Sequence, residues 1–451
     1  MTEQEKKEHA GGCCKGGRAE HAAGCCHNGA AAGAGKNDGM QKGSDTHDGG
    51  HAHGKKKPEL KDHVSREEAI EKLFAVWDMR TDIESVHVSE ACTRTLAEDI
   101  FALYDQPVVR ASAMDGVAVR SADFANGMPD TSKWQPGTDY VRADTGDDFD
   151  DAFDSVIRIE NVKILENGGI KIAEDEEFYA GMNVMPRGNN IKKGTQVAKE
   201  GDILTPAALA AIILAGHGDV KVRKKPVFAF IPTGSELVPA GSVLARGQNF
   251  DSNSIMVKTT LERMGAEVVL HPIIKDDPAA VKAALDKMID EADVVILNAG
   301  TSKGSEDYCV TYLEKNGKML FHGVRAVPGR PMSITIYKDK PVINMSGPSV
   351  GALNGCYWFL PAVIDRMLGH TEPMYLPQAE VILKDDLSFA PFFSTFCGLM
   401  LSKGEDGMLY AQPMPKSMPR SAALVADAFY LSKQGEEPKS AGDRIKVFLA
   451  K

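Results

Sequence analysis

Between residues 226 and 369, short apolar runs alternate with stretches of helical spacing, and this alternation constrains the fold more than any other feature of the sequence. Apolar, β-branched runs that alternate with helices predict an open, parallel α/β sheet with both faces covered. We expect strands at 227–231, 267–270, 294–297, 332–337 and 341–345, and helices at 254–264, 278–291, 306–315 and 350–368.

The chain has 451 residues, which is more than one hydrophobic core of about 250–300 residues accommodates. Its net charge of −11 argues against a general nucleic-acid binder, which needs a surplus of basic residues. The longest apolar stretch, 207–216, is about half the length of a bilayer span, and the charged start resembles no secretory signal. We therefore expect a cytoplasmic, multidomain protein that binds neither nucleic acid nor membrane.

The first 57 residues differ in composition from the rest. They contain Cys13, Cys14, Cys25 and Cys26, many Gly and His residues, and few large apolar side chains, so we expect a disordered tail. Thiolates and imidazoles on a flexible segment can bind a transition metal, but paired adjacent Cys residues are poor tetrahedral chelators. Transition-metal binding and a low-complexity extension without a metal both stay open.

The remaining sequence divides into four expected domains, of which the α/β domain is the third. A capping box at 65–68 begins a helix over 65–79 that we expect to pack on the α/β domain. The region before residue 181 has short strands and many turn residues, and the last 80 residues are similar in character. The expected divisions are linking domain I at 58–103 and 181–224, β-rich domain II at 104–180, α/β domain III at 225–371 and β domain IV at 372–451.

In an open α/β sheet, ligands bind beyond the carboxyl ends of the strands, and the loops expected there are rich in Gly, Ser and Thr. The strand at 227–231 leads into Thr233–Glu236, the strand at 294–297 into a loop reaching Asp307, and the strand at 341–345 into Ser346 and Gly347. Backbone N–H groups in such loops suit phosphate, and carboxylates beside phosphate usually hold Mg²⁺. A nucleotide or phosphorylated ligand with a divalent cation is the expected occupant.

Two simpler interpretations compete with this site. Gly-Ser-Thr turns are common after strands, and Asp251 and Asp307 also suit ordinary helix caps. The segment 300–304 fits the GxSxG nucleophile elbow with Ser302 as nucleophile, but His322 follows too closely for a hydrolase triad. Three such loops on one sheet edge favour a ligand site over both of these simpler interpretations.

Five ordered motifs carry a family resemblance over about residues 62–451. The segment Ser112-Ala-Met-Asp-Gly-Val-Ala118 resembles the SAMDGYA signature of the molybdopterin molybdenumtransferase family, which includes the C-terminal domain of gephyrin. Segments 231–238, 251–253, 304–308 and 328–331 match further family motifs in the same order.

The resemblance implies that adenylylated molybdopterin and molybdate give molybdenum cofactor and AMP, with Mg²⁺ or another divalent cation. It also implies an elongated homodimer with its site between subunits, and apo-enzymes that accept the cofactor. The resemblance places Glu236, Asp251 and Asp307 near the metal and phosphates, and Asp115 and Thr145 in the partner's site. The expected cofactor-binding residues are Thr233, Gly234, Ser235, Gly300, Thr301, Ser302, Gly304, Pro328, Gly329, Arg330, Pro331, Ser346 and Gly347.

Several positions depart from the family pattern within the expected pocket. Ser235 replaces an Asp, Gly323 and Val327 align with two common lysines, and 346–349 reads Ser-Gly-Pro-Ser instead of PGNP. The loop that begins at Thr145 is more acidic than its family counterpart. Losing cations weakens oxyanion binding, so a tungstate-preferring paralogue and a non-catalytic carrier of the pterin both stay open beside the enzyme.

Overall fold

The computed structural model describes residues 63–173, 178–300, 308–370, 372–415 and 419–450. The Cys/His-rich tail lies outside these residues, and so does any binding of a transition metal to it. Within them, no helix is long and apolar enough to cross a membrane.

The α/β body is built on one six-stranded sheet with the strand order β15-β12-β16-β20-β19-β17. The first four strands are parallel, as expected, but β19 and β17 run antiparallel to their neighbours, so the prediction of a fully parallel sheet was wrong. The turn between β19 and β20 is a short hairpin, which joins only antiparallel strands. The strands are β12 (Val227–Pro232), β15 (Glu267–Leu270), β16 (Val294–Asn298), β17 (Lys318–His322), β19 (Ser333–Tyr337) and β20 (Lys340–Met345).

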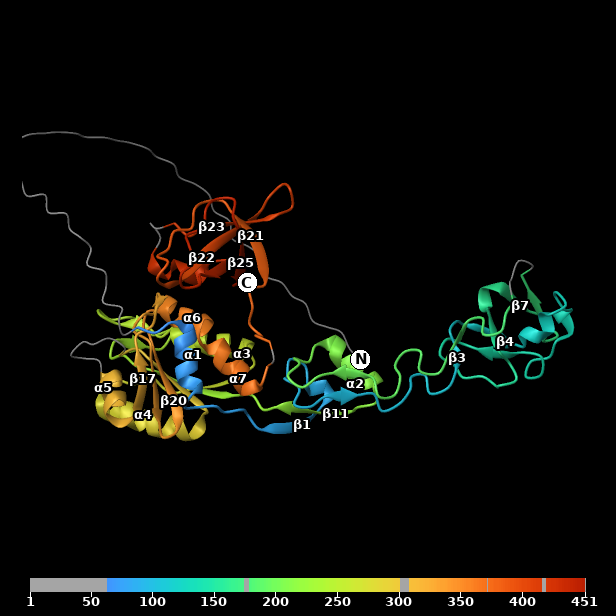
Figure 1. The fold of residues 1–451 in the computed structure, drawn as a ribbon, viewed down its shortest axis with the longest axis horizontal. Coiled ribbons are helices and arrows are strands. Elements are labelled where there is room, and N and C mark those ends of the chain that lie inside the picture. Colours follow the sequence, from blue (N-terminus) through green and yellow to red (C-terminus); the bar gives the residue numbers. More distant parts are fainter. Residues whose placement is uncertain (1–62, 174–177, 301–307, 371, 416–418, 451) are drawn as a thin grey trace, which may run out of the picture. The chain divides into compact units, whose positions relative to one another are not determined.

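Helices cover both faces of this sheet (Figure 1). On one face, Leu73, Leu261 and Val363 from three helices share a core with the sheet. On the other face, Leu285 and Leu313 share a second core with it. The first layer contains α1 (Arg66–Phe74), α3 (Asn253–Arg263), α6 (Ser349–Trp358) and α7 (Leu360–Leu368), and the second contains α4 (Pro278–Glu291) and α5 (Tyr308–Asn316).

Local sequence signals determine where these helices begin and end. Asp277 accepts the Ala280 N–H at 2.8 Å, and Pro278 follows it, so α4 begins at its predicted residue. The expected single helix over 350–368 is instead α6 and α7, interrupted at Phe359. Pro361 lacks the N–H that a continuous helix needs at this turn, which explains the interruption.

Residues on both sides of the β-rich insertion form a smaller unit with its own apolar core. Strand β1 (Ile83–His87) pairs with β11 (Asp219–Arg223), and β2 (Ile100–Phe101) pairs with β10 (Gln196–Ala198). The helix α2 (Pro206–Leu214) begins at a Thr205 cap, and of its residues Ile212 is buried.

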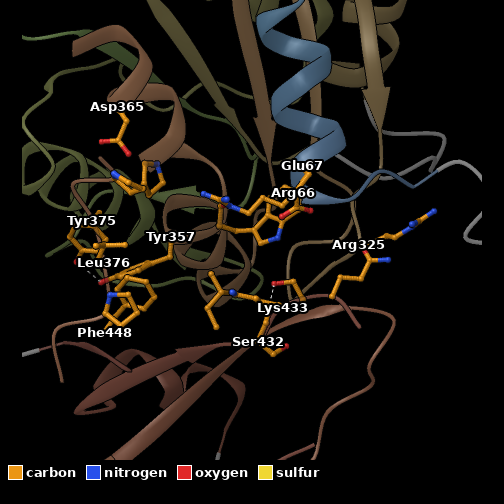
Figure 2. Close-up of a pocket in the computed structure, with 17 residues that line it drawn as sticks. Arg66, Glu67, Arg325, Tyr357, Asp365, Tyr375, Leu376, Ser432, Lys433 and Phe448 are labelled. Atoms are coloured by element: carbon orange, nitrogen blue, oxygen red, sulfur yellow. Dashed lines mark hydrogen bonds between the residues drawn. The ribbon is translucent and has the colours of Figure 1, made fainter. Parts of the chain in front are cut away.

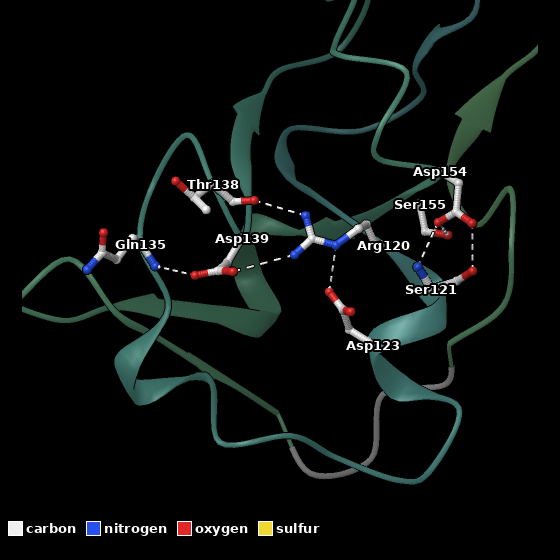
Figure 3. A network of polar contacts seen from close by, with 8 residues as sticks. All are labelled: Arg120, Ser121, Asp123, Gln135, Thr138, Asp139, Asp154 and Ser155. Atoms are coloured by element: carbon white, nitrogen blue, oxygen red, sulfur yellow. Dashed lines mark hydrogen bonds and ion pairs between the residues drawn. The ribbon is translucent and has the colours of Figure 1, made fainter.

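The β-rich insertion is organised by β4 (Gly116–Val119), which lies between β5 (Val141–Ala143) and β6 (Ser155–Arg158). Figure 3 shows how polar contacts join its turns: Arg120 donates to Asp123, Thr138 and Asp139, and Asp154 accepts three bonds from Ser121 and Ser155. Its remaining strands are β3 (Ala111–Ser112), β7 (Val162–Ile164), β8 (Ile170–Ile172) and β9 (Val184–Met185).

The C-terminal strands close into a small barrel, because β22 pairs with both β23 and β24 and the ring continues through β21 and β25. Strand β18 (Ala326–Val327) of the α/β body adds to this sheet through β22. The barrel strands are β21 (Ala379–Leu383), β22 (Ser394–Lys403), β23 (Leu409–Pro413), β24 (Ala428–Leu431) and β25 (Arg444–Leu449).

Candidate functional site

The loops after β12, β16 and β20 meet at the carboxyl edge of the parallel strands. Pro232 lies opposite Asn298, and Asn298 lies opposite Met345, so the three strands end at the same level. Thr233 donates its N–H and its hydroxyl to the Asn298 carbonyl, each at 3.1 Å. The expected loop residues Thr233, Gly300 and Ser346 therefore lie along one edge.

Side-chain amides join the same loops to the start of α3. Asn253 Nδ2 donates to Asn298 Oδ1 at 2.8 Å and to the Gly347 carbonyl at 2.7 Å. Asn298 Nδ2 in turn donates to the Ser346 carbonyl at 2.8 Å. These buried bonds fix the loop after β20 against the loop after β16.

The backbone between these loops is strained and crowded. Ala299 has φ +100°, which is unusual for a residue with a side chain. Gly300 follows at φ +61°, and a β-carbon there would lie 3.0 Å from Cys309 Sγ. A β-carbon at Gly347 would lie 3.2 Å from that of Ala299. Such strain concentrates at functional sites, where the surrounding structure holds it.

A cavity of about 670 Å³ opens beside the loop after β12, and we call it the sheet-edge cavity. Gly234, Ser235 and Asp251 line it, together with His271 and Lys275. Lys275 was not among the predicted site residues. It supplies a cation to a cavity that we expect to receive an oxyanion.

Ser235 is held by two reciprocal bonds with Asp276. The Ser235 N–H donates to Asp276 Oδ2 at 2.9 Å, and the Asp276 N–H donates to Ser235 Oγ at 3.3 Å. Asp276 thus places a carboxylate beside the backbone of Ser235, although Asp276 itself does not line the cavity.

The two described candidate metal ligands, Asp251 and Glu236, have different surroundings. Asp251 caps α3: its oxygens accept the Ser254 N–H at 3.1 Å and the Ser254 hydroxyl. The Glu236 carboxylate lies against Gly234, where a β-carbon would come within 2.7 Å of Oε2. Among the described residues, no group of three or more His, Cys, Asp or Glu side chains is arranged to hold a metal.

The loop at 328–331 is seated on α6. Asn354 Nδ2 donates to the Pro328 carbonyl at 2.6 Å, and Gly329, at φ +106°, leaves no room for a β-carbon beside the Gly351 carbonyl. Arg330 is exposed and Pro331 half-buried, so the loop presents a cation to solvent.

Asp115 and Thr145 are brought together in the β-rich insertion. The Thr145 N–H and hydroxyl both donate to Asp115 Oδ1 at 2.8 Å. These bonds hold the pKa of Asp115 below its ordinary value, with a smaller contribution from Arg142. The carboxylate is therefore ionised at neutral pH.

Backbone contacts support this pair. The Gly146 N–H donates to the Ser112 carbonyl at 2.8 Å, and the Ser112 N–H donates to the Asp147 carbonyl at 2.9 Å. A β-carbon at Gly116 would lie 2.0 Å from the Ile157 carbonyl oxygen. The glycine after Asp115 is therefore required by the close approach of β6.

Four candidates, Thr301, Ser302, Gly304 and Asp307, lie outside the described residues. The nucleophile-elbow interpretation depends on the same segment. The amide roles of Asn253 and Asn298, Lys275 and the Asp276 partner of Ser235 were not predicted. The available signals were the place of Asn298 directly after an apolar run and the place of Asn253 at the start of a helix.

Two family models match the chain. The model described as "MoeA N-terminal region (domain I and II)" matches residues 64–216, and that described as "Probable molybdopterin binding domain" matches residues 229–365.

Full-length relatives support the same grouping. A molybdopterin molybdenumtransferase of Haemophilus influenzae is 28% identical over 398 residues, which cover 85% of this chain and 98% of the relative. The enzyme of the same name from Staphylococcus aureus (strain COL) is 28% identical over 413 residues, which cover 87% of this chain and 96% of the relative. A crystal structure of a molybdopterin biosynthesis MoeA protein from Pyrococcus horikoshii OT3 matches with a TM-score of 0.68 and 26% identity, covering 86% of this chain and 100% of that one.

Proposed function

The chain belongs to the molybdopterin molybdenumtransferase (MoeA) family, and we propose that it inserts molybdate into adenylylated molybdopterin and releases AMP. Similarity to enzymes of this name over almost their entire length is the observation that carries the proposal. The sheet-edge cavity and the three loops beside it are the proposed site.

The chemistry of this edge suits the substrates. Loops with Gly, Ser and Thr after parallel strands offer backbone N–H donors to phosphate oxygens. Lys275 in the cavity and Arg330 on the neighbouring loop add positive charge. The buried amides of Asn253 and Asn298 orient the loops, so that they hold one geometry before substrate arrives.

The donor set also fits a divalent cation. Mg²⁺ is usually held by one or two carboxylates together with substrate phosphates, so a three-residue cluster is not required. We propose that Glu236 and Asp251 hold it together with substrate phosphates, and that Asp307, which lies outside the described residues, is the third ligand expected from the sequence. When bound, the cation would neutralise charge on the phosphates and on the departing AMP.

We propose further that the enzyme is a homodimer in which Asp115 and Thr145 act in the partner's site. An apolar, exposed helix face supports this, because Ile213 and Leu214 of α2 are 55% and 51% exposed. Exposed apolar residues that adjoin one another favour a protein interface.

Two departures from the family pattern have local structural explanations. Asp276 supplies a carboxylate beside Ser235, which replaces the family Asp. Gly323 has φ +101°, and a β-carbon there would lie 2.6 Å from the His63 ring, so a lysine cannot be accommodated without rearrangement. Tungstate in place of molybdate stays the alternative substrate.

We also propose a cytoplasmic location and transfer of the product to apo-enzymes that use the cofactor. None of the described cysteines forms a disulfide bond, in keeping with a reducing compartment.

Release of AMP tests the reaction. Purified protein is incubated with adenylylated molybdopterin, Mg²⁺ and either molybdate or tungstate, and AMP is measured by chromatography. We expect AMP with one oxyanion and none after chelation of Mg²⁺. Tight pterin binding without AMP under any condition would instead support the carrier.

Mixed dimers test the shared site. Asp115→Asn and Asp251→Asn variants are each expected to be inactive as homodimers. If one site uses Asp115 from one subunit and Asp251 from the other, co-expressed heterodimers regain one intact site. Absence of recovered activity in purified heterodimers would contradict the shared site while leaving the reaction itself untouched.

A further inference from the structure

A second cavity, of about 550 Å³, lies where α1, the α6–α7 break and the C-terminal barrel meet, and we call it the junction cavity (Figure 2). It shares no lining residue with the sheet-edge cavity. Its walls are held by the β18–β22 pairing and by a common core in which Tyr357 contacts Phe396, Phe429 and Phe448. The cavity is therefore built from packed elements of the α/β body and of the C-terminal barrel.

Three cations line the junction cavity: Arg66, Arg325 and Lys433. Arg66 Nε donates to the Trp358 carbonyl at 2.5 Å. Within the part of the chain that the structure describes, none of the three side chains forms an ion pair within 4.0 Å. Arg66 and Arg325 are half-buried, whereas Lys433 is exposed. Half-buried cations without counter-ions carry a desolvation cost that an anion would offset.

Burial also lowers the pKa of Arg66, although Glu67 and Asp365 act in the opposite direction. Asp365 is already engaged, since its Oδ1 accepts from His370 Nδ1 at 2.8 Å and from the Met374 N–H at 3.2 Å. Glu67 is exposed at the rim. The groups available to a ligand are thus predominantly cationic.

The remaining wall is apolar and partly flat. Tyr375 and Phe448 stack with their ring centroids 5.5 Å apart and their planes 7° apart. Leu376 and Leu431 extend this wall. Cavities of roughly 300–1,000 Å³ with apolar walls and few polar groups are typical of small-molecule sites.

We propose that the junction cavity binds a small organic anion, with a carboxylate or phosphate group held by Arg66, Arg325 and Lys433. A planar apolar body of the ligand lies against Tyr375, Leu376 and Phe448. This site is separate from the proposed reaction site and does not depend on its activity.

Titration calorimetry on the full chain tests the site with phenyl phosphate, benzoate and uncharged benzyl alcohol. We expect at least one anion to bind with a Kd below about 1 mM and benzyl alcohol to bind at least ten times more weakly. Binding of only one anion identifies the preferred group. Failure of both anions, or equal binding of benzyl alcohol, would overturn the proposal.

Charge variants locate the binding. Leu376 is 55% exposed, so Leu376→Asp adds an anion to the cavity with little effect on folding, and Leu424→Asp adds one to another exposed leucine, 37% exposed, outside the cavity lining. Lys446 is an exposed cation of β25 that does not line the cavity, so Lys446→Gln is the control for Arg325→Gln. We expect Leu376→Asp and Arg325→Gln each to weaken anion binding at least tenfold, whereas Leu424→Asp and Lys446→Gln leave it unchanged. Equal effects in variant and control would show that the anion binds elsewhere.

Discussion

Thr145 donates both its backbone N–H and its hydroxyl to one oxygen of Asp115, at 2.8 Å each. One residue thereby fixes the carboxylate, stabilises its ionised form and lowers its pKa. Because the second oxygen remains outside this pair of bonds, an oriented anion is presented from the β-rich insertion. Such an anion can position a water molecule or a substrate donor.

Thr145→Val should raise the pKa of Asp115, because valine keeps the backbone bond and loses the hydroxyl bond. The folded-state pKa is depressed, so its contribution to stability is present above the unfolded pKa and is lost as pH falls through the folded pKa. In the variant this contribution is smaller, and its loss is complete at a higher pH. Carbon-detected NMR titration of the Asp115 carboxyl measures the shift, and turnover should fall roughly tenfold.

Thr138→Val serves as the control for this change. Thr138 is exposed in the same insertion, and its backbone carbonyl, which the substitution keeps, accepts from Arg120. Its Asp115 titration and turnover should equal those of the wild type. An unchanged Asp115 pKa in Thr145→Val would show that the hydroxyl does not stabilise the carboxylate.

Asn253→Ala should destabilise the protein and lower turnover. The substitution removes the donor for Asn298 Oδ1 and the Gly347 carbonyl, and an unsatisfied buried group costs about 1–3 kcal/mol. Denaturant unfolding and AMP release measure the two effects. Asn316→Ala, which removes one exposed amide bond to the Tyr312 carbonyl, should change turnover little. Similar losses of turnover in both variants would argue against a specific role for Asn253.

The sequence predicted those parts of the fold that depend on local signals. Asp277 and Pro278 define the start of α4, and the uniformly apolar run at 294–297 marks a central strand. β17 was missed because Lys318 and His322 flank only three apolar residues, and its place beside β19 depends on long-range pairing. The direction of β19 was predicted wrongly, since strand patterns do not show which way a strand runs.

In the candidate site, too, the features that depend on local sequence could be predicted and those that depend on long-range contacts could not. Loops at strand ends could be predicted, because parallel strands must end at one edge of a sheet. The amide bonds of Asn253 could not, since they join residues 45 and 94 positions apart in the sequence. The reciprocal bonds of Ser235 and Asp276 likewise depend on how two loops fold against each other.

Gly323→Ala should destabilise the protein more than Gly407→Ala. Both glycines have positive φ, for which a left-handed side-chain residue costs about 1–2 kcal/mol. Only Gly323 would also bring its β-carbon to 2.6 Å from the His63 ring, whereas nothing lies within 4 Å at Gly407. The difference in unfolding free energy measures this contact, and Gly323→Lys should fail to raise turnover. Equal destabilisation would mean that His63 moves away freely.

Asp251→Asn should separate the capping role of this residue from its proposed metal role. Asparagine can still accept the Ser254 N–H, so the start of α3 should remain and the unfolding free energy should change by less than about 1 kcal/mol. Turnover should nevertheless fall about 100-fold or more, because the charge that faces the cation and phosphates is lost. Asp277→Asn makes the same exchange at the α4 cap, where Asp277 accepts the Ala280 N–H at 2.8 Å, and should leave turnover unchanged. If both variants retain wild-type turnover across a Mg²⁺ titration, Asp251 is a helix cap alone, and the cation must be held by other groups.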